Sequence, residues 1–157
     1  MQTPSDDAPP ARLTTLPSWL LTQTATHAHR LVSEGFTAVH ARGYHYRLLA
    51  ALDEYGPASQ AALGRRSGIH LSDMVATINE LSERQLVERE PDPTDRRRNV
   101  ITITPDGRRQ LRLLDKQLTR IQDNLLAPLS PEERDELTRL LARVLDHHDR
   151  RSTRSDG

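Results

Sequence analysis

Apolar residues recur three or four positions apart in six stretches of the chain, which is the spacing of one face of an α-helix. Glycine or proline separates most of these stretches, and neither residue continues a helix easily. The pattern therefore predicts six helices, within residues 16–42, 44–55, 61–67, 72–81, 104–127 and 130–148. Two shorter runs, residues 86–89 and 100–103, predict strands.

The stretch from residue 57 to residue 107 organises the rest of the chain. Two short helices meet there at a turn, Ser67-Gly68, and the two strand-like runs follow. The loop between these runs holds two prolines, two aspartates and the three consecutive arginines 96–98. Helix, turn, helix and a hairpin with a cationic tip form a winged helix-turn-helix. Such a unit offers one helix for the major groove and an arginine loop for the minor groove or the phosphates.

The fifth predicted helix carries a narrow apolar stripe typical of helix pairing. Its members are Leu111, Leu114, Leu118, Ile121 and Leu125. We expect the first, fifth and sixth helices to pair with those of a second copy, which predicts a homodimer; alternatively, the stripes close on each other within one subunit. The domain is predicted to span residues 15–150, between a disordered arm (1–14) and a frayed tail (151–157).

Composition narrows the possible functions. The 22 basic and 22 acidic residues give a net charge of zero, which argues against a non-specific nucleic-acid binder, so DNA binding must depend on where the charges lie. The chain has no cysteine, which excludes disulfides, thiolate metal sites and thiol-based sensing. No apolar run reaches the roughly 18 residues of a membrane span, so we expect a cytoplasmic protein that contacts no membrane.

The helix at residues 72–81 is predicted to read DNA with the face opposite Met74, Ile78 and Leu81. That face places Ser72, Asp73, Ala76, Thr77 and Asn79 near the bases. Asparagine can pair with adenine through two hydrogen bonds, and serine can bond to either kind of base edge. The helix has no arginine to bind guanine, so modest base discrimination is expected.

Enzyme and metal functions find little support. No nucleophile elbow, phosphate-binding loop or zinc-protease motif is present, and the seven histidines lack the spacing of helical metal ligands. We therefore expect neither catalysis nor a cofactor or metal. The remaining alternative is a winged-helix adaptor that binds proteins without sequence-specific DNA binding, but it would not need the arginines at 96–98.

Several segments of the chain resemble the MarR family of bacterial transcription regulators. They are residues 56–60, 72–75, 86–89, 92–100 and 103–107. The resemblance implies a mainly α (α+β) fold, with the winged helix-turn-helix at about 44–107 and dimerisation helices at about 16–42 and 104–148. It also implies a homodimeric repressor, nucleoid-associated when bound, that leaves an inverted-repeat operator in double-stranded DNA when a small molecule binds.

The resemblance further implies DNA contacts by Ser59, Gln60, Arg96, Arg97 and Arg98, with Asp95 bracing Arg97. This sequence departs from the family at Ala76, where arginine is frequent, and at His70, which replaces a common aspartate.

The effector site is predicted where the dimerisation helices meet the winged helix-turn-helix. The candidate residues are Trp19, His27, His45, Tyr46 and Arg47. Trp19 and Tyr46 are suited to stacking on an aromatic ring, and His45 or Arg47 to an anionic or phenolic group. The alternative is that Trp19 only packs in a core and that His45 is merely exposed.

Overall fold

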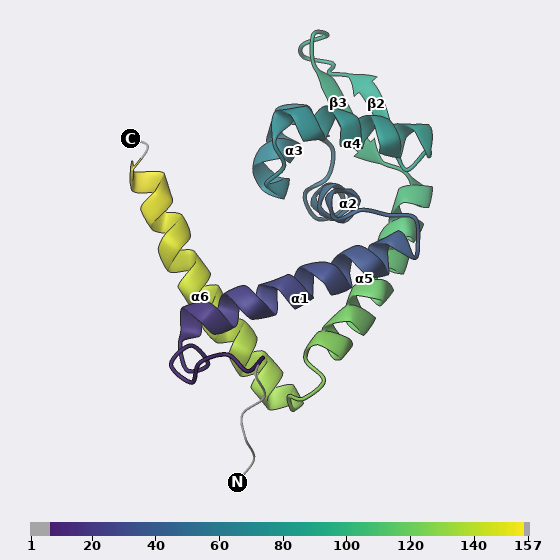
Figure 1. Ribbon diagram of the computed structural model, residues 1–157. Helices are drawn as coiled ribbons and strands as arrows, with labels where there is room; N and C mark the ends of the chain where they lie inside the picture. The colour runs from purple at the N-terminus through teal and green to yellow at the C-terminus, as the bar shows by residue number, and fades with distance from the viewer. Residues whose placement is uncertain (1–6, 156–157) are drawn as a thin grey trace. The chain divides into compact units, whose positions relative to one another are not determined.

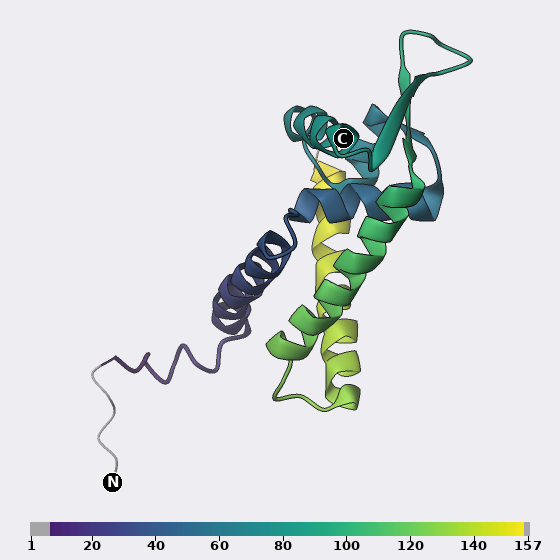
Figure 2. The ribbon, with the colours of Figure 1, turned by 90° about the vertical axis from the view of Figure 1, so that its right-hand side faces the viewer.

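The computed structural model describes residues 7–155 (Figures 1 and 2). Residues 1–6 and 156–157, the outer parts of the predicted arm and tail, lie outside the described residues. The elements in chain order are α1 (Pro17–Thr37), α2 (Gly43–Tyr55), β1 (Ala58–Ser59), α3 (Gln60–Ser67), α4 (Leu71–Glu83), β2 (Val87–Pro91), β3 (Asn99–Ile103), α5 (Pro105–Leu125) and α6 (Pro131–Ser155). The predicted mainly helical, winged helix-turn-helix fold is confirmed.

The chain divides into two compact units, one ending at Ile121 and the other beginning at Gln122. We call the described part of the first the winged unit (7–121) and that of the second the C-terminal unit (122–155). The boundary falls within α5.

The core of the winged unit is formed by α2, α3, α4, α5 and the sheet. Its largest fully buried side chains are Leu48, Leu49, Leu52, Leu63, Met74, Ile78, Leu81, Val87, Ile101 and Leu114. Leu48 and Leu49 lie four and three residues before Leu52 in α2, and Met74, Ile78 and Leu81 are spaced four and three apart in α4, so each of these two helices turns one apolar stripe inward.

The corner between α3 and α4 is fixed by local hydrogen bonds. The Ser59 hydroxyl caps α3 by accepting from the Ala62 N–H at 3.2 Å. Gly68 ends the helix with a φ of 64°, a left-handed conformation that costs a side-chain-bearing residue more than glycine. The chain can therefore turn sharply into α4.

The sheet has the strand order β1-β3-β2 and is antiparallel throughout. Strands β2 and β3 pair from Val87↔Ile103 to Pro91↔Asn99. Val87, Ile101 and Ile103 are buried, which fixes the register because a slip of one residue would expose them. The β2–β3 loop, which we call the wing loop (92–98), projects beyond the helices of this unit (Figures 1 and 2).

The first helix ends earlier than the sequence predicts. The helix α1 stops at Thr37, and residues 38–42 form a turn in which His40 has a φ of 55°. The Ala41 N–H donates to the Phe36 carbonyl at 2.9 Å, closing that turn. The prediction that the first helix extends to residue 42 is therefore wrong, and Gly43 is the first residue of α2.

Most of the apolar stripe on α5 is buried within the winged unit itself. Leu111, Leu114 and Ile121 are buried, and Gln117 donates to the Gly35 carbonyl of α1 at 3.0 Å. A Cβ added at Gly35 would lie 2.6 Å from Ile121 Cδ1, so α1 approaches α5 closely. The prediction that these α5 residues pair with a second copy is wrong, since their partners are in the same chain.

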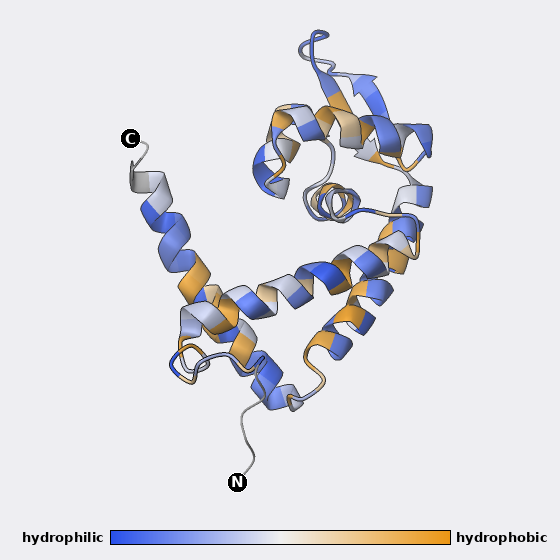
Figure 3. Ribbon diagram, in the orientation of Figure 1, coloured by the Kyte–Doolittle hydropathy of each residue, from blue (hydrophilic) through white to orange (hydrophobic). Residues whose placement is uncertain are grey.

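The C-terminal unit contains α6 and the end of α5. A capping box begins α6: the Glu133 carboxylate accepts from the Ser130 N–H at 3.0 Å, and the Glu133 N–H donates to the Ser130 hydroxyl at 3.2 Å. The helix continues to Ser155, past residue 150, where the sequence predicts fraying. Hydrophobic and hydrophilic stretches alternate along it (Figure 3).

The predicted disordered arm is partly structured. Leu13 N–H donates to the Pro10 carbonyl, and Leu16 N–H donates to the Leu13 carbonyl, each at 2.9 Å. Residues 11–15 therefore form turns that lead into α1.

Candidate nucleic-acid interface

The outward face of α4 begins at its first residue. The exposed side chains along it are Leu71, Ser72, Val75, Ala76 and Asn79. Asp73 is half-buried, and Met74, Ile78 and Leu81 face the core. The structure therefore places Ser72, Ala76 and Asn79 on the predicted face and adds Leu71 and Val75 to it.

Thr77 does not belong to this face. Its side chain is 4% exposed, and its hydroxyl donates to the Asp73 carbonyl at 2.7 Å. Position 77 lies three residues after Met74 and four before Leu81, which is the spacing of the inner stripe. The prediction that Thr77 lies near the bases is wrong, and Val75, which the sequence pattern grouped with the core, is exposed.

Asn79 is already engaged by the wing. The guanidinium of Arg89, on β2, donates a hydrogen bond to the Asn79 side-chain oxygen. Pairing with adenine through two hydrogen bonds uses the same oxygen, which would then be shared between Arg89 and the base.

Two aspartates shape the wing loop. The Asp92 carboxylate accepts from the Thr94 N–H at 2.9 Å and from the Thr94 hydroxyl at 2.7 Å. These two hydrogen bonds lower the pKa of Asp92 below its ordinary value, because they favour the charged carboxylate. The Asp92 N–H also donates to the Arg98 carbonyl at 2.8 Å, which closes the loop.

Asp95 braces the loop in a different way from the one expected. Its carboxylate accepts from the backbone N–H of Arg97 at 3.1 Å and lies 3.7 Å from the Arg98 guanidinium. The prediction that Asp95 pairs with the Arg97 side chain is therefore wrong in this structure. The side chains of Arg96, Arg97 and Arg98 are all exposed.

A hollow of about 600 Å³ brings the wing together with α3 and α4. It is lined by Ser59, Gln60, Ala61, Arg65, Leu71, Val75, Arg97, Arg98 and Asn99. Three of these nine residues are arginines and none is acidic. Four predicted DNA contacts (59, 60, 97 and 98) meet here, beside the first two turns of α4, whereas Arg96 is not in the lining.

His45 is buried rather than exposed. Its Nε2 lies 2.8 Å from the Glu80 carboxylate on α4, and its Nδ1 accepts from the Arg42 N–H at 3.3 Å. The Arg42 guanidinium reaches the same carboxylate at 2.8 Å. These three residues line an open hollow of about 580 Å³ with Thr37, His40 and Arg84.

Tyr46, the next residue of α2, joins three helices. Its hydroxyl donates to Asp115 of α5 at 2.9 Å, and its ring centroid is 6.1 Å from that of Phe36 in α1. Burial raises the pKa of Tyr46 to about 12, helped by the hydrogen bond to Asp115.

The predicted effector residues do not converge within one winged unit. Trp19 lies in the first turns of α1 and Phe36 in its last, so the helix separates them by roughly 25 Å. His27 is exposed between them, and the Arg47 guanidinium lies 5.9 Å from the Tyr44 ring, away from His45.

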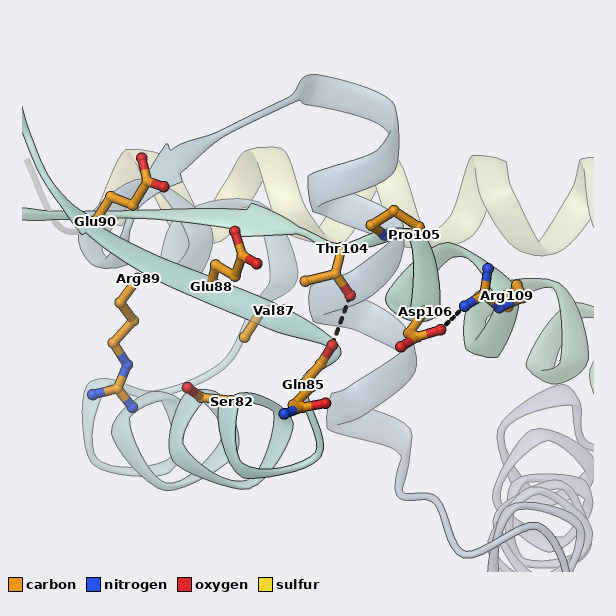
Figure 4. Close-up of a pocket in the computed structure, with 10 residues that line it drawn as sticks. All are labelled: Ser82, Gln85, Val87, Glu88, Arg89, Glu90, Thr104, Pro105, Asp106 and Arg109. Atoms are coloured by element: carbon orange, nitrogen blue, oxygen red, sulfur yellow. Dashed lines mark hydrogen bonds and ion pairs between the residues drawn. The ribbon is translucent and has the colours of Figure 1, made fainter.

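A further hollow lies between the end of α4, β2 and the start of α5 (Figure 4). Its rim mixes acidic and basic side chains, and Asp106 pairs with Arg109. The Thr104 hydroxyl donates to the Gln85 carbonyl at 2.7 Å and accepts from the Gly107 N–H at 2.9 Å. A Cβ added at Gly107 would clash with the Leu86 carbonyl oxygen, so the chain is closely packed where α5 begins. We therefore assign this hollow to the junction between β3 and α5.

Between residues 7 and 155, no helix is long and apolar enough to cross a membrane. Within the same range, no group of three or more histidine, aspartate or glutamate side chains is arranged to hold a metal ion.

The sequence model of the MarR family matches residues 34–98, which hold α2, the helix-turn-helix, β2 and the wing loop. The chain is 33% identical over 99 residues to a protein of Thauera aromatica named as a transcriptional regulatory protein for the hcr operon. It is 30% identical over 98 residues to the HTH-type transcriptional repressor NicR of Pseudomonas putida. These alignments cover 63% and 62% of this chain, and they span only 60% and 62% of the two relatives.

A solved structure extends the likeness beyond the wing. The PcaV transcriptional regulator of Streptomyces coelicolor, in complex with its natural ligand, matches with a TM-score of 0.71 and 28% identity, over 88% of this chain and 98% of that one. A solved structure of a transcriptional regulator from Pseudomonas aeruginosa is 30% identical, with a TM-score of 0.74, over 85% of this chain and 99% of that one. The chain belongs to the MarR family.

In this MarR-family chain, sequence reasoning missed two residues of the candidate interface, Leu71 and Val75, which lie on the outer face of α4. Val75 was missed because it adjoins Met74 in sequence and an apolar run does not say which member turns inward. Only the helical spacing of the buried residues 74, 77, 78 and 81 shows that Met74 faces inward and Val75 outward.

Proposed function

We propose that this chain is a sequence-specific DNA-binding transcription regulator that represses from an inverted-repeat operator. The observation that carries the proposal is the cationic hollow beside the first two turns of α4. It joins a helix face suited to the major groove with wing arginines suited to the minor groove or the phosphates.

The placement of charge supports DNA as the partner. The chain has no net charge, so it has no general attraction to nucleic acid. Three cations instead meet in one hollow that has no acidic residue in its lining: Arg65 from α3 faces the same hollow as Arg97 and Arg98. Arginines bind phosphate oxygens and enter narrow minor grooves, whose negative potential attracts them.

We propose that the chain binds its operator as a homodimer. On α6, Leu140, Leu141, Val144 and Leu145 are exposed, and so are Leu16, Leu20 and Leu21 at the start of the chain's first helix. Apolar residues that are exposed together on a helix favour a partner of the same character. In a two-fold dimer, two copies of α4 would reach successive major grooves about one helical turn apart, which calls for an inverted repeat.

We propose that a small-molecule effector releases the dimer from DNA. The relative NicR is named a repressor, and PcaV was solved with its natural ligand. We propose that an effector binds two dimer geometries unequally and so shifts their populations. Tyr46 and His45 are the predicted effector residues best placed to transmit this, because they connect α2 to α5 and to α4.

The proposal is tested with the purified full chain. Duplexes enriched from a random double-stranded library would be labelled and titrated by fluorescence anisotropy at two salt concentrations. We expect an inverted-repeat consensus. Arg97→Ala should lose about 1–3 kcal/mol of binding free energy on the enriched site, because we propose that its guanidinium enters the minor groove. Arg98→Ala should weaken all duplexes alike and lower the salt slope by about one.

Arg30→Ala is the matched control, because it removes one exposed arginine from α1 rather than from the hollow. It should bind like the parent. A library without any enriched sequence, or wing variants that bind like the parent, would remove DNA recognition as the function.

A further inference from the structure

The first two turns of α4 present apolar side chains to solvent. Leu71 is 69% exposed and Val75 is 45% exposed, and their spacing of four residues puts them on one face of the helix. The exposed side chains that accompany them are Ser72, Ala76 and Asn79. None of these five side chains is charged, and α4 contains no basic residue.

This apolar face borders the cationic hollow. Leu71 and Val75 line it together with Arg65, Arg97 and Arg98. Apolar groups that lie among phosphate-binding cations are placed against whatever those cations bind. Charge complementarity therefore favours nucleic acid as the occupant over an apolar protein surface.

The major groove offers one apolar group for such a face. Thymine carries a 5-methyl group there, whereas none of the other three bases carries a methyl group at its edge. In helix-turn-helix proteins the N-terminal residues of the second helix contact the base edges, and Leu71 and Val75 occupy that part of α4.

We propose that Leu71 and Val75 recognise the 5-methyl groups of thymines in each operator half-site. The inference rests on the proposed DNA-binding function and deepens it: the substrate is an operator with thymine at fixed positions. Ser72 is the neighbouring polar contact, while Asn79 is held by Arg89, so hydrogen bonding to the bases contributes less along this face.

The test removes the methyl group from the DNA without changing base pairing. A site would first be enriched from a random duplex library with the full chain. Single thymines would then be replaced by deoxyuridine, which lacks only the 5-methyl group. At the contacted positions we expect binding to weaken by about fourfold per methyl group, as for one buried CH₂-sized group. Thymines elsewhere in the duplex serve as controls and should show no change.

Protein variants assign the contact to its residue. In Val75→Ala or Leu71→Ala, the deoxyuridine penalty at the matching position should disappear, because its partner is gone. Both side chains are exposed, so the fold should persist, as thermal melting followed by circular dichroism will show. Arg98→Ala is the matched control: it should weaken binding to every duplex yet keep the full penalty.

The outcomes distinguish thymine-methyl recognition from DNA binding itself. An enriched site that binds equally well with deoxyuridine at every position, or that has no fixed thymine, overturns methyl recognition and leaves DNA binding standing. A library without enrichment overturns both, and the exposed Leu71 and Val75 would then mark a surface for a protein partner.

Discussion

The helices α5 and α6 carry apolar stripes that look alike in sequence but differ in their surroundings. On α5, Leu111, Leu114 and Ile121 are covered by the part of the core that α1 and α2 of the same chain form. Leu114 is 0% exposed. On α6, the stripe that includes Leu141 and Leu145 is open, and Leu145 is 61% exposed.

The difference shows what helical periodicity can and cannot establish. Spacing of three and four residues identifies an apolar face, because those positions lie on one side of a helix. It does not identify the partner that covers the face. A stripe covered within the chain stabilises the subunit, whereas an open stripe is available for association.

The largest effect is expected from charging the open stripe. In Leu141→Glu/Leu145→Glu, each lost leucine burial costs roughly 1.5–3 kcal/mol in the proposed dimer, before any penalty for the carboxylates. The dimer dissociation constant should rise by at least about a hundredfold. Size-exclusion chromatography with light scattering should find a monomer whose helical content is retained.

The control for that variant is His147→Glu, an acidic substitution at an exposed polar position of the same helix. It should leave the assembly unchanged. A double-glutamate variant that remains a dimer at low concentration would show that a different surface pairs the subunits.

A smaller loss is expected on the covered stripe. Leu114→Ala removes a fully buried side chain and should lower the free energy of unfolding by about 2–5 kcal/mol. Because the partners of Leu114 are in its own chain, the loss should appear in urea titrations at every protein concentration. Val75→Ala truncates an exposed aliphatic side chain and should change stability by less than about 0.5 kcal/mol. Equal effects for the two variants would contradict the closed core.

The fold was largely predictable because local signals agreed with one another. Gly68 at the turn, the Ser130–Glu133 capping box and the spacing of Leu48, Leu49 and Leu52 each describe a local event, and each is present. The end of α1 was misplaced because it depends on a left-handed His40, which sequence patterns rarely mark.

The site was less predictable because it depends on contacts between distant segments. The sequence pointed to Arg97 and Arg98, but it could not show that Arg65 faces the same hollow. It suggested His45 as a ligand contact, yet His45 is bound to Glu80, which lies 35 residues further along the chain. Such pairings follow from tertiary packing, and no local pattern encodes them.

The contact between α1 and α5 offers a finer test of the covered stripe. Gly35→Ala would place a methyl group 2.6 Å from Ile121 Cδ1, which forces Ile121 to shift. Overpacking costs about 1–3 kcal/mol, and the better helix propensity of alanine recovers up to about 1 kcal/mol, so we expect a modest net loss. In an Ile121→Val background the clashing atom is absent, and Gly35→Ala should then cost less. Chemical denaturation of the four proteins measures this coupling, and an unchanged cost in the valine background would mean that the helices do not meet at this point.

The smallest effect concerns the hydrogen bond that ties α2 to α5. The folded protein raises the pKa of Tyr46 from 10.0 to about 12, chiefly through burial and then through Asp115. Between these two pH values the unfolded chain has lost this proton while the folded chain still holds it. The contribution of Tyr46 to stability is therefore complete below pH 10 and is lost as the pH rises toward 12. In Tyr46→Phe, stability should decline less steeply over that window, whereas Tyr55→Phe leaves the Tyr46–Asp115 bond in place and should keep the parent's slope. Denaturation midpoints at several pH values measure these slopes. If parent and Tyr46→Phe decline in parallel, the hydroxyl does not hold α5 against α2, and the covered stripe depends on apolar packing alone.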